Sequence, residues 1–593
     1  MKTKIYIYLL FWLVPITVFS QWSNNPGQNT VIADTIGDQV IPHVVRNSIG
    51  ETYISWFSDL GNLNFDVYLQ KLNTDGTKAW DNEGLLISNN ITNTWVTDYD
   101  MTLDNDENVI LVTQDQRTGS SNVFAYKLSP DGDFLWGDDG IQLSNTTGFD
   151  PFPKVVVADN NDAVFMWADE PADTTQFSNI NITRIAPDGT MIWESNIYDT
   201  LDMMLPQMIK ADSEGFFISC ITKTKIQDTT LGQENWMHVY AQRISENGFP
   251  LWGFGVQVDS IDLMSYLSLY TTPYLTNDGN DGAYIMWQSF YPNELGGKPT
   301  TYVNRIYADG SIWKRDGYNV STQYENYHAE AEMAYLENAD KLVVCWNEYH
   351  YDAQNLIDCW GVRGQMFDPN GNYLWADTGK VFVPLNRAMD TSYNSIKIDE
   401  STNNNIILTY DKDYFSIDGA DTGFVTHINA MSFDIDGEMI WSPPMVSISI
   451  SSSNKYQVAL SNLVDNQWVL AWNDNISNPD QLSGYGIYAQ NISVNGEIGP
   501  SSVAQNINDS FQIEVWPNPT NDKINITYTV EAVQLVQIEI IDINGRVLVQ
   551  TTKSENTPGI YVEEIDISNI RQGMYFVKMN SEKISATTKF IKK

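Results

Sequence analysis

Cysteine, basic residues and long apolar runs are scarce in this chain of 593 residues, and each shortage excludes a class of protein. The three cysteines, Cys220, Cys345 and Cys359, are too few for a disulfide scaffold and lack the spacing of a zinc or redox pair, so we expect them in the core. The 33 basic residues face 75 acidic ones, and a net charge of −42 repels nucleic acid and anionic membranes. We therefore expect no nucleic-acid partner.

The one long apolar run lies at the N-terminus. Lys2 and Lys4 precede an apolar stretch at residues 5–18, and small or β-branched residues follow at positions 18 and 20. This pattern is typical of a Sec signal peptide, and the run is shorter than the roughly 20 residues that span a bilayer. We predict a signal peptide at residues 1–20, a mature chain from near Gln21, and no transmembrane segment in it. An uncleaved membrane anchor is the alternative.

Helical periodicity is also missing, and a repeat of about 60 residues stands in its place. Each repeat contains an Asp-Gly or Asn-Gly turn followed by Trp. The complete pairs are Asp75-Gly76 with Trp80, Asp131-Gly132 with Trp136, Asp188-Gly189 with Trp193, Asn247-Gly248 with Trp252, Asp309-Gly310 with Trp313, Asn370-Gly371 with Trp375 and Asp436-Gly437 with Trp441. An eighth turn, Asn495-Gly496, has no Trp after it, whereas Trp22 has no turn before it.

Each repeat also contains short runs of β-branched and aromatic residues separated by polar turns, such as residues 154–157 and 163–167. Asp-Gly and Asn-Gly between such runs indicate hairpins, and we expect type I′ turns with positive φ at both central residues. The repeat is thus a four-stranded antiparallel meander, which is typical of a propeller blade. The repeats resemble those of secreted bacterial β-propellers. We predict an all-β fold with an eight-bladed β-propeller at residues 21–498.

The displaced Trp predicts how the ring closes. If residues 22 to about 35 supply the outermost strand of the last blade, the first and last blades are joined by strand pairing and the ring has no exposed edge. The alternative is an open array of eight units.

The repeat stops before the last 83 residues. After a polar linker at residues 499–510, alternating segments and the turn Asn544-Gly545 predict a small immunoglobulin-like β-sandwich at residues 511–593. Four ordered motifs lie in it, at residues 516–520, 543–547, 573–577 and 589–593. They resemble the C-terminal (type A) sorting domain of type IX secretion cargo. The resemblance rests on Pro517, Asn518, Pro519, Gly545, Gly573, Tyr575, Lys589, Lys592 and Lys593.

This resemblance implies handling by the type IX secretion machinery of Gram-negative bacteria. The protein would cross the outer membrane, usually lose the domain, and be released or anchored at the cell surface. An ordinary accessory domain is the alternative, since a fold alone does not carry function.

Catalytic and metal-binding motifs are absent from the sequence. The five histidines have no metal-ligand spacing, and no nucleophile elbow occurs. Acidic runs at residues 104–108 and 277–281 have the composition of calcium loops, but we interpret them as solvated turns, with calcium as the alternative. We predict no catalytic residue, no metal site and no cofactor.

Function is expected where the repeats differ, because features shared by every blade serve folding. In a meander blade, the loops between second and third strands and the connections between blades share one face, which we call the loop-rich face. Aromatic and acidic residues there suit a glycan or a protein partner. The ligand-binding candidates are Trp95, Tyr99, Tyr266, Tyr270, Tyr327, His328, Asp352 and Tyr393.

We therefore predict a secreted or cell-surface β-propeller that binds a glycan or a surface protein. The alternative is a glycan-degrading enzyme, a glycosidase or lyase, with carboxylates at the mouth of the central tunnel. The sequence favours binding and leaves an enzyme open, and it does not identify the ligand, the oligomeric state, or anchoring versus release.

Overall fold

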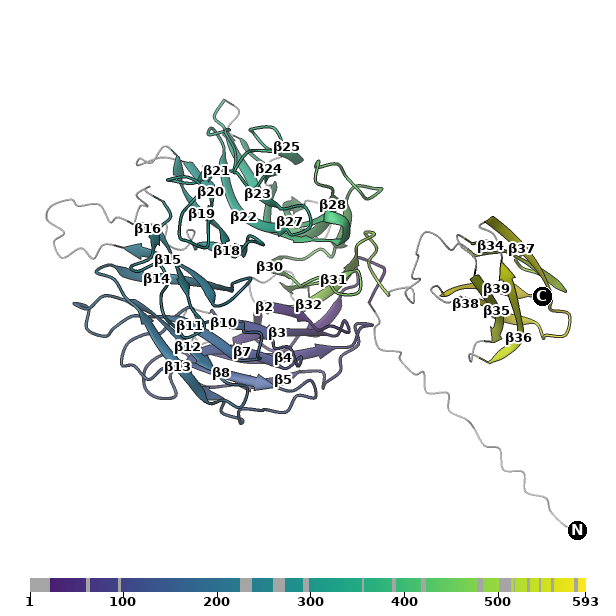
Figure 1. The fold of residues 1–593 in the computed structure, drawn as a ribbon, viewed down its shortest axis with the longest axis horizontal. Helices are drawn as coiled ribbons and strands as arrows, with labels where there is room; N and C mark the ends of the chain where they lie inside the picture. The colour runs from purple at the N-terminus through teal and green to yellow at the C-terminus, as the bar shows by residue number, and fades with distance from the viewer. Residues whose placement is uncertain are drawn as a thin grey trace, which may run out of the picture. The chain divides into compact units, whose positions relative to one another are not determined.

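The structure is a computed structural model that describes residues 22–59, 64–93, 98–223, 237–259, 272–291, 298–354, 357–386, 391–416, 423–476, 484–500, 513–516, 518–530, 534–542, 546–555, 559–580 and 585–593. The chain divides into two compact units, residues 1–500 and 501–593 (Figure 1). The helices and strands of the described residues are all strands except for one 3₁₀ turn at Thr402–Asn404, so the all-β prediction is confirmed. None of their helices could span a membrane. The predicted signal peptide lies outside the described residues.

In the first unit, the described residues form eight four-stranded antiparallel sheets, numbered here along the chain. Sheet 1 contains β2 (Asp38–Arg46), β3 (Thr52–Asp59), β4 (Phe65–Leu72) and β5 (Leu85–Ser88). Sheet 2 contains β6 (Asp100–Leu103), β7 (Val109–Asp115), β8 (Asn122–Leu128) and β9 (Ile141–Gln142). Sheet 3 contains β10 (Lys154–Val157), β11 (Ala163–Asp169), β12 (Asn179–Ile185) and β13 (Met191–Ile197). Sheet 4 contains β14 (Asp202–Lys210), β15 (Phe216–Lys223), β16 (Met237–Ile244) and β17 (Val256–Gln257).

The second half of the first unit continues this pattern. Sheet 5 contains β18 (Tyr274–Asn277), β19 (Ala283–Tyr291), β20 (Lys298–Ile306) and β21 (Tyr318–Asn319). Sheet 6 contains β22 (Tyr327–Leu336), β23 (Lys341–Asp352), β24 (Ile357–Phe367) and β25 (Lys380–Asn386). Sheet 7 contains β26 (Thr391–Glu400), β27 (Ile406–Ser416), β28 (Gly423–Phe433) and β29 (Val446–Ser449). Sheet 8 has the order β1 (Thr30–Ala33), β32 (Gly486–Ser493), β31 (Gln467–Asp474) and β30 (Lys455–Leu460).

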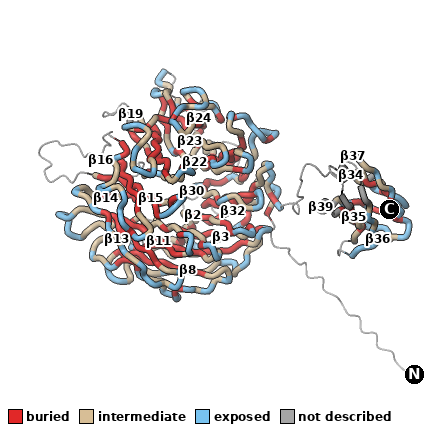
Figure 2. Tube along the Cα trace, viewed as in Figure 1, coloured by how far each residue is buried: buried red, intermediate tan, exposed pale blue. Residues whose placement is uncertain are grey.

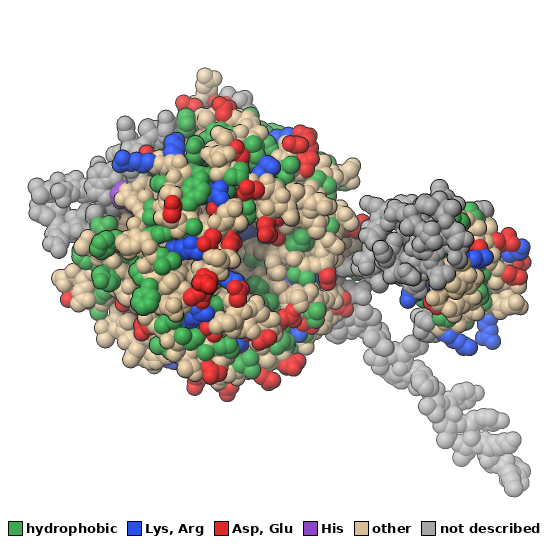
Figure 3. Space-filling view, in the orientation of Figure 1, with side chains coloured by type: hydrophobic (Ala, Val, Ile, Leu, Met, Phe, Trp, Pro, Cys, Tyr) green, Lys and Arg blue, Asp and Glu red, His purple; other side chains and the backbone are tan. Residues whose placement is uncertain are grey.

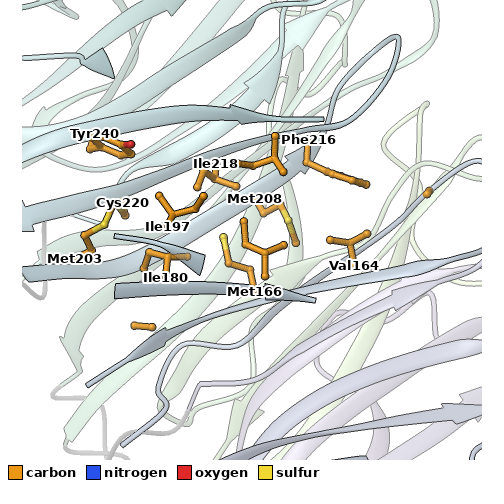
Figure 4. Packing of buried hydrophobic residues seen from close by; sticks show 14 residues of the cluster. Val164, Met166, Ile180, Ile197, Met203, Met208, Phe216, Ile218, Cys220 and Tyr240 are labelled. Atoms are coloured by element: carbon orange, nitrogen blue, oxygen red, sulfur yellow. The ribbon is translucent and has the colours of Figure 1, made fainter. Parts of the chain in front are cut away.

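The sheets stand around a common centre, as in a propeller (Figure 1). The first strands β2, β6, β10, β14, β18, β22, β26 and β30 contact one another in this order, and β30 contacts β2. Apolar residues of neighbouring sheets share buried clusters, and much of the chain in these sheets is buried (Figure 2). Between sheets 3 and 4, Val164 and Met166 of β11 belong to one cluster with Met208, Phe216 and Ile218 (Figure 4). Face-to-face burial of this kind supplies the main stabilisation of the unit.

The Gly turns and the Trp residues meet between neighbouring sheets. Trp22 donates from its backbone N to the O of Asp75 at 2.9 Å and from Nε1 to the O of Thr74 at 3.2 Å. A Cβ on Gly76 would lie 2.6 Å from the Trp22 ring, so only glycine fits there. The same Nε1 contact to the next sheet's turn is made by Trp136, Trp193, Trp252, Trp313, Trp375 and Trp441. The offset between turns and Trp residues therefore has a physical cause, because these Trp side chains bind the Gly turn of the next sheet.

The turns themselves differ from the prediction. All eight turn glycines have positive φ, between +75° and +91°, but the Asp or Asn before each glycine does not. The expected type I′ geometry is therefore wrong. At the first turn, the N of Gly76 donates to the O of Asn73 and the N of Asn73 donates to the O of Thr77, which is a longer turn with one left-handed residue.

The acidic runs at residues 104–108 and 277–281 form turns between first and second strands, as predicted, and most of their residues are exposed or partly exposed, but one Asp in each run is buried. Asp104 and Asp278 are buried, and each forms an ion pair with a base of the third strand, Asp104 with Lys127 at 2.8 Å and Asp278 with Arg305 at 2.7 Å. Asp104 also accepts the N of Asn108 at 2.8 Å. A charged partner on the third strand of the same sheet offsets the cost of burying each of these two carboxylates.

The C-terminal unit contains two packed sheets. One consists of β33 (Ile513–Trp516), β34 (Lys523–Val530) and β37 (Gly559–Asp566). The other has the order β36 (Val547–Glu555), β35 (Gln534–Asp542), β38 (Gly573–Asn580) and β39 (Ser585–Lys592). Ile524 and Ile526 of β34 share a buried cluster with Ile538 and Ile540 of β35, so the apolar faces of the two sheets meet.

Candidate functional site

The strand register defines one equivalent position in the first strand of every sheet. In most sheets the second strand contains a buried Trp, and in the others a different residue takes its place. The first-strand residue in question pairs with the residue that comes immediately before this Trp or its replacement. The eight residues, which we call the central ring, are His43, Asp100, Lys154, Gln207, Tyr274, Glu332, Lys397 and Ala459. All are partly exposed, whereas neighbours such as Val44, Met101 and Ile396 are buried. The position in the strand is thus the same in every sheet, whereas the type of side chain differs from sheet to sheet.

Bulges aim these side chains. In sheets 1, 4, 6, 7 and 8, two residues of the first strand have no partner just before the central ring position. The first of the two adopts φ between +44° and +55°, although it is never glycine: Ile41, Leu205, Glu330, Ser395 and Gln457. A bulge redirects the following side chain, and a left-handed non-glycine residue costs conformational energy.

Opposite charges lie side by side in the central ring. Lys154 Nζ is 2.9 Å from an oxygen of Asp98, and Lys397 Nζ is 3.2 Å from Glu332 Oε2. His43 Nδ1 is 3.9 Å from Asp100 Oδ1, and burial lowers the pKa of His43. Figure 3 shows acidic and basic side chains together around the hollow at the middle of the first unit. Because these acidic and basic side chains pair with one another, little charge is left unpaired to attract a strongly charged ligand.

A second group of acids lies on β27. The Asp411 carboxylate is 2 % exposed and accepts the N of Asn394 at 3.1 Å. Burial, and then the charge of Asp413, raise the pKa of Asp411 to about 7. Asp413 accepts hydrogen bonds from Thr426 Oγ1 at 2.6 Å and Asn394 Nδ2 at 2.9 Å. Buried Lys455 lies close by, and burial lowers its pKa to about 8.

Asp413 opens into a pocket of about 210 Å³ where sheets 6, 7 and 8 meet. The pocket, which we call the aromatic pocket, is lined by Asp358, Trp360, Thr391, Ser392, Asp413, Phe424, Asn454 and Tyr456. These residues lie where second strands end and where third and first strands begin, which places the pocket on the loop-rich face. Phe424 is 60 % exposed and Tyr456 is 43 % exposed. The Trp360 ring packs against Tyr349 at 4.7 Å, and Tyr456 packs against Tyr485 at 5.8 Å.

Three of the predicted ligand contacts are buried. Tyr99 donates from its OH to the O of Ile41 at 2.9 Å. His328 lies with Nδ1 3.0 Å from Thr300 Oγ1, and burial lowers its pKa to about 4. Tyr393 packs at 5.7 Å from Tyr410. These side chains fill gaps between sheets, so they support the face without reaching a ligand.

The remaining predicted contacts are divided. Tyr327 and Asp352 are partly exposed on sheet 6, where Tyr327 packs edge-on against Tyr349 at 5.0 Å. Trp95, Tyr266 and Tyr270 lie outside the described residues. The prediction overlooked the aromatic pocket and the central ring. Aligning the repeats on the second-strand Trp would have revealed the ring, because every ring residue pairs with that Trp's neighbour.

The raised pKa of Asp411 predicts an unusual dependence of stability on pH. The native carboxyl holds its proton more tightly than the unfolded chain, whose Asp pKa is about 3.9. The protonated Asp411 carboxyl therefore contributes to the free energy of unfolding. This contribution is complete below about pH 4 and is lost as the pH rises to about 7, with a slope of at most about 1.4 kcal/mol per pH unit. Melting curves between pH 4 and 7.5 should show the slope reduced in Asp411→Asn. Asp436→Asn, at an exposed turn, is the matched control. Parallel curves for Asp411→Asn and the wild type would contradict the prediction.

In the C-terminal unit, the first and last sorting motifs bind each other. Asn518 donates from Nδ2 to the O of Lys589 at 3.1 Å and accepts the N of Ile591 at 3.0 Å. Lys593 donates from its N to the O of Thr520 at 2.8 Å, and Lys592 Nζ donates to the O of Asn521. Pro519 follows Asn518 in this loop. We call this set of contacts the terminal clamp.

The middle motifs are less completely described. Gly573 begins β38, and Tyr575 donates from its OH to the O of Arg571 at 2.8 Å. Pro517 and Gly545 lie outside the described residues.

Comparison with known proteins identifies the C-terminal unit. Residues 514–593 match the family described as secretion system C-terminal sorting domain, which indicates secretion through the type IX machinery. No curated protein matches the sequence.

Solved structures resemble the first unit only distantly. A protein of unknown function from Dyadobacter fermentans is 11 % identical, with a TM-score of 0.34 over 78 % of this chain and 97 % of that chain. An α-L-arabinofuranosidase from Fusarium graminearum is 11 % identical, with a TM-score of 0.32 over 54 % of this chain and 92 % of that one. An α-L-arabinanase from Penicillium chrysogenum is 13 % identical, with a TM-score of 0.30 over 54 % and 94 %. These values are too low to assign a function.

Proposed function

We propose that this exported protein binds a glycan through the aromatic pocket on its loop-rich face. In this proposal the eight sheets are the blades of a closed propeller at residues 21–498, with β1 as the closing strand. Residues 499–510 are the linker, residues 511–593 are the sorting domain, and residues 1–20 are the signal peptide. The observation that carries the proposal is a pocket that combines three aromatic rings with a carboxylate and amide and hydroxyl groups.

The chemistry of the aromatic pocket suits a sugar. The rings of Trp360, Phe424 and Tyr456 offer flat faces to the C–H surface of a sugar ring, while Asp413 and Asn454 can bond its hydroxyl groups. A volume of about 210 Å³ is below the range of about 300 to 1,000 Å³ for drug-sized ligands. The pocket therefore suits one sugar unit, such as the end or a branch of a glycan.

Glycan hydrolysis is the second candidate function, and the observation that favours it is the Asp411 and Asp413 pair. Residues two apart on a strand have their side chains on the same face, with Cα atoms about 7 Å apart. Burial raises the pKa of both carboxyl groups, that of Asp411 to about 7, and a raised pKa is what a general acid requires. Binding remains the better supported function, because Asp411 is buried against Asn394 and does not line the pocket.

A glycan array and a hydrolysis screen on the full chain test the proposal. Trp360→Ala and Tyr456→Ala should each weaken binding by about two- to tenfold, since an aromatic contact contributes about 0.5 to 1.5 kcal/mol beyond its burial. Tyr198→Ala changes a 75 % exposed tyrosine that follows β13, outside the pocket; it is the matched control and should leave binding unchanged. Hydrolysis lost by about 10² or more in Asp411→Asn or Asp413→Asn would favour the enzyme instead. If Trp360→Ala and Tyr456→Ala bound the glycan as tightly as Tyr198→Ala, the aromatic pocket would be rejected as the binding site.

A further inference from the structure

A larger groove lies on the outer part of the loop-rich face, between sheets 2 and 3. It has a volume of about 740 Å³ and is lined by residues 142–146, which begin at the last residue of β9, and by residues of β11, β12 and β13. Its residues come from strand ends on the same face as the aromatic pocket, but the two sites share no residue. We call it the sheet 2–3 groove.

The groove exists because two outer strands differ in length. The outermost strand of sheet 2, β9, has only two residues, so the chain leaves the edge early and passes through Ser144 and Thr146. The outermost strand of sheet 3, β13, has seven residues and extends as a wall that carries Glu194 and Asn196. Folding alone does not require this difference, since other sheets close with outer strands of two residues.

A hydrogen-bond network fixes the polar groups of the groove. Asn196 Nδ2 donates to Asn181 Oδ1 at 2.7 Å, and Asn181 Nδ2 donates to Asp169 Oδ2 at 3.4 Å. On the opposite side, Ser144 Oγ donates to Asp150 Oδ2 at 2.5 Å. Buried Asp150 thus fixes the side of the groove that contains Ser144, and the amide network fixes the side formed by sheet 3. Groups held in this way lose little entropy when a ligand binds.

Other polar groups in the groove are left for a ligand. Asn145 and Glu194 are exposed, and their side chains have no hydrogen-bond partner among the described residues. Amides and carboxylates supply donors and acceptors side by side, as a row of hydroxyl groups requires. The groove contains the carboxylates of Asp169 and Glu194 and no Lys or Arg. An anionic ligand would therefore be repelled.

We infer that the sheet 2–3 groove is a second binding site, for a neutral oligosaccharide segment. The volume lies within the range of ligand pockets and exceeds that of the aromatic pocket, so the groove suits several sugar units in a row. The inference shares its ligand class with the proposed function but depends on different residues. Two sites on one face would bind a long glycan more tightly than either alone.

Calorimetric titration of the full chain tests this inference. The probes are neutral xylo-, manno-, gluco- and arabino-oligosaccharides of four to six units, with tetragalacturonate as the anionic comparison. At least one neutral probe should occupy the groove, and tetragalacturonate should not. Asn196→Ala and Asn145→Ala should each weaken the affinity of the groove for the neutral probe by about two- to tenfold, because each removes a hydrogen-bonding amide. Tyr198→Ala, just beyond β13, is the matched control, and an unchanged melting temperature shows that the variants fold.

The outcomes separate the two sites. Binding weakened by Asn196→Ala and Asn145→Ala but not by Trp360→Ala supports the groove even if the aromatic pocket fails. Binding weakened by Trp360→Ala alone supports the pocket and overturns the groove. The groove is also overturned if no neutral probe binds, or if tetragalacturonate binds as tightly as the neutral probes.

Discussion

Deletion of residues 22–36 is expected to unfold the first unit or to lower its melting temperature by more than 10 °C. β1 pairs with β32, where Thr30 faces Ala489, and Trp22 and Ile32 lie in the apolar cluster between sheets 8 and 1. Loss of a buried Trp costs about 3 to 5 kcal/mol and loss of a buried Ile about 2 to 5 kcal/mol. Their sum approaches the whole stability of a typical domain, about 5 to 15 kcal/mol.

A point variant separates the closing role of this segment from the loss of chain length. Trp22→Ala removes the contact with the first turn, where Trp22 Nε1 meets the O of Thr74, and should lower the melting temperature clearly. Ile36→Ala, at a side chain that is 90 % exposed in the same segment, is the matched control and should have no effect. If the deletion left the melting temperature unchanged, β1 would not be a closing strand and the open array would be favoured.

The sequence predicted the repeat well because its strongest signals are local. A turn glycine and a Trp three or four residues later can be recognised from a short stretch of sequence, and the displaced Trp22 pointed to a partner at the far end of the chain. The turn type was predicted wrongly for a non-local reason. The ring of Trp22 covers Gly76, so the turn is shaped by contact with another sheet as much as by its own two residues.

The site was predicted less well, because exposure cannot be judged from residue type near a strand end. Tyr99 and Tyr393 lie beside loops in the sequence, yet neighbouring sheets cover both rings. The central ring was overlooked because bulges interrupt the alternation of inward and outward side chains. After the bulge at Glu330, for example, the pairing resumes only at Glu332, and a period of two no longer predicts where its side chain points. The loop-rich face was still the right place to search for the aromatic pocket.

Removal of residues 514–593 is expected to abolish delivery across the outer membrane, because the sorting family matches only there. The terminal clamp allows a sharper test than truncation. Asn518 binds one edge of the last strand at two points, the O of Lys589 and the N of Ile591, and the O of Thr520 accepts the N of Lys593. If the machinery recognises the folded end of the chain, loosening the clamp should impair export without changing the last five residues.

We expect Asn518→Ala to reduce the exported fraction several-fold, measured by immunoblot of medium, surface and periplasm in a host with type IX machinery. Two hydrogen bonds to the terminal strand are lost in Asn518→Ala, at about 0.5 to 1.5 kcal/mol each, which is enough to fray a strand end. Lys523→Ala, which breaks an exposed surface pair with Glu564 in the same unit, is the matched control, because such pairs contribute little. Full export of the 514–593 truncation would contradict the sorting role. Normal export of Asn518→Ala beside a failed truncation would instead show that the machinery reads the sequence of the terminal residues and not their clamped conformation.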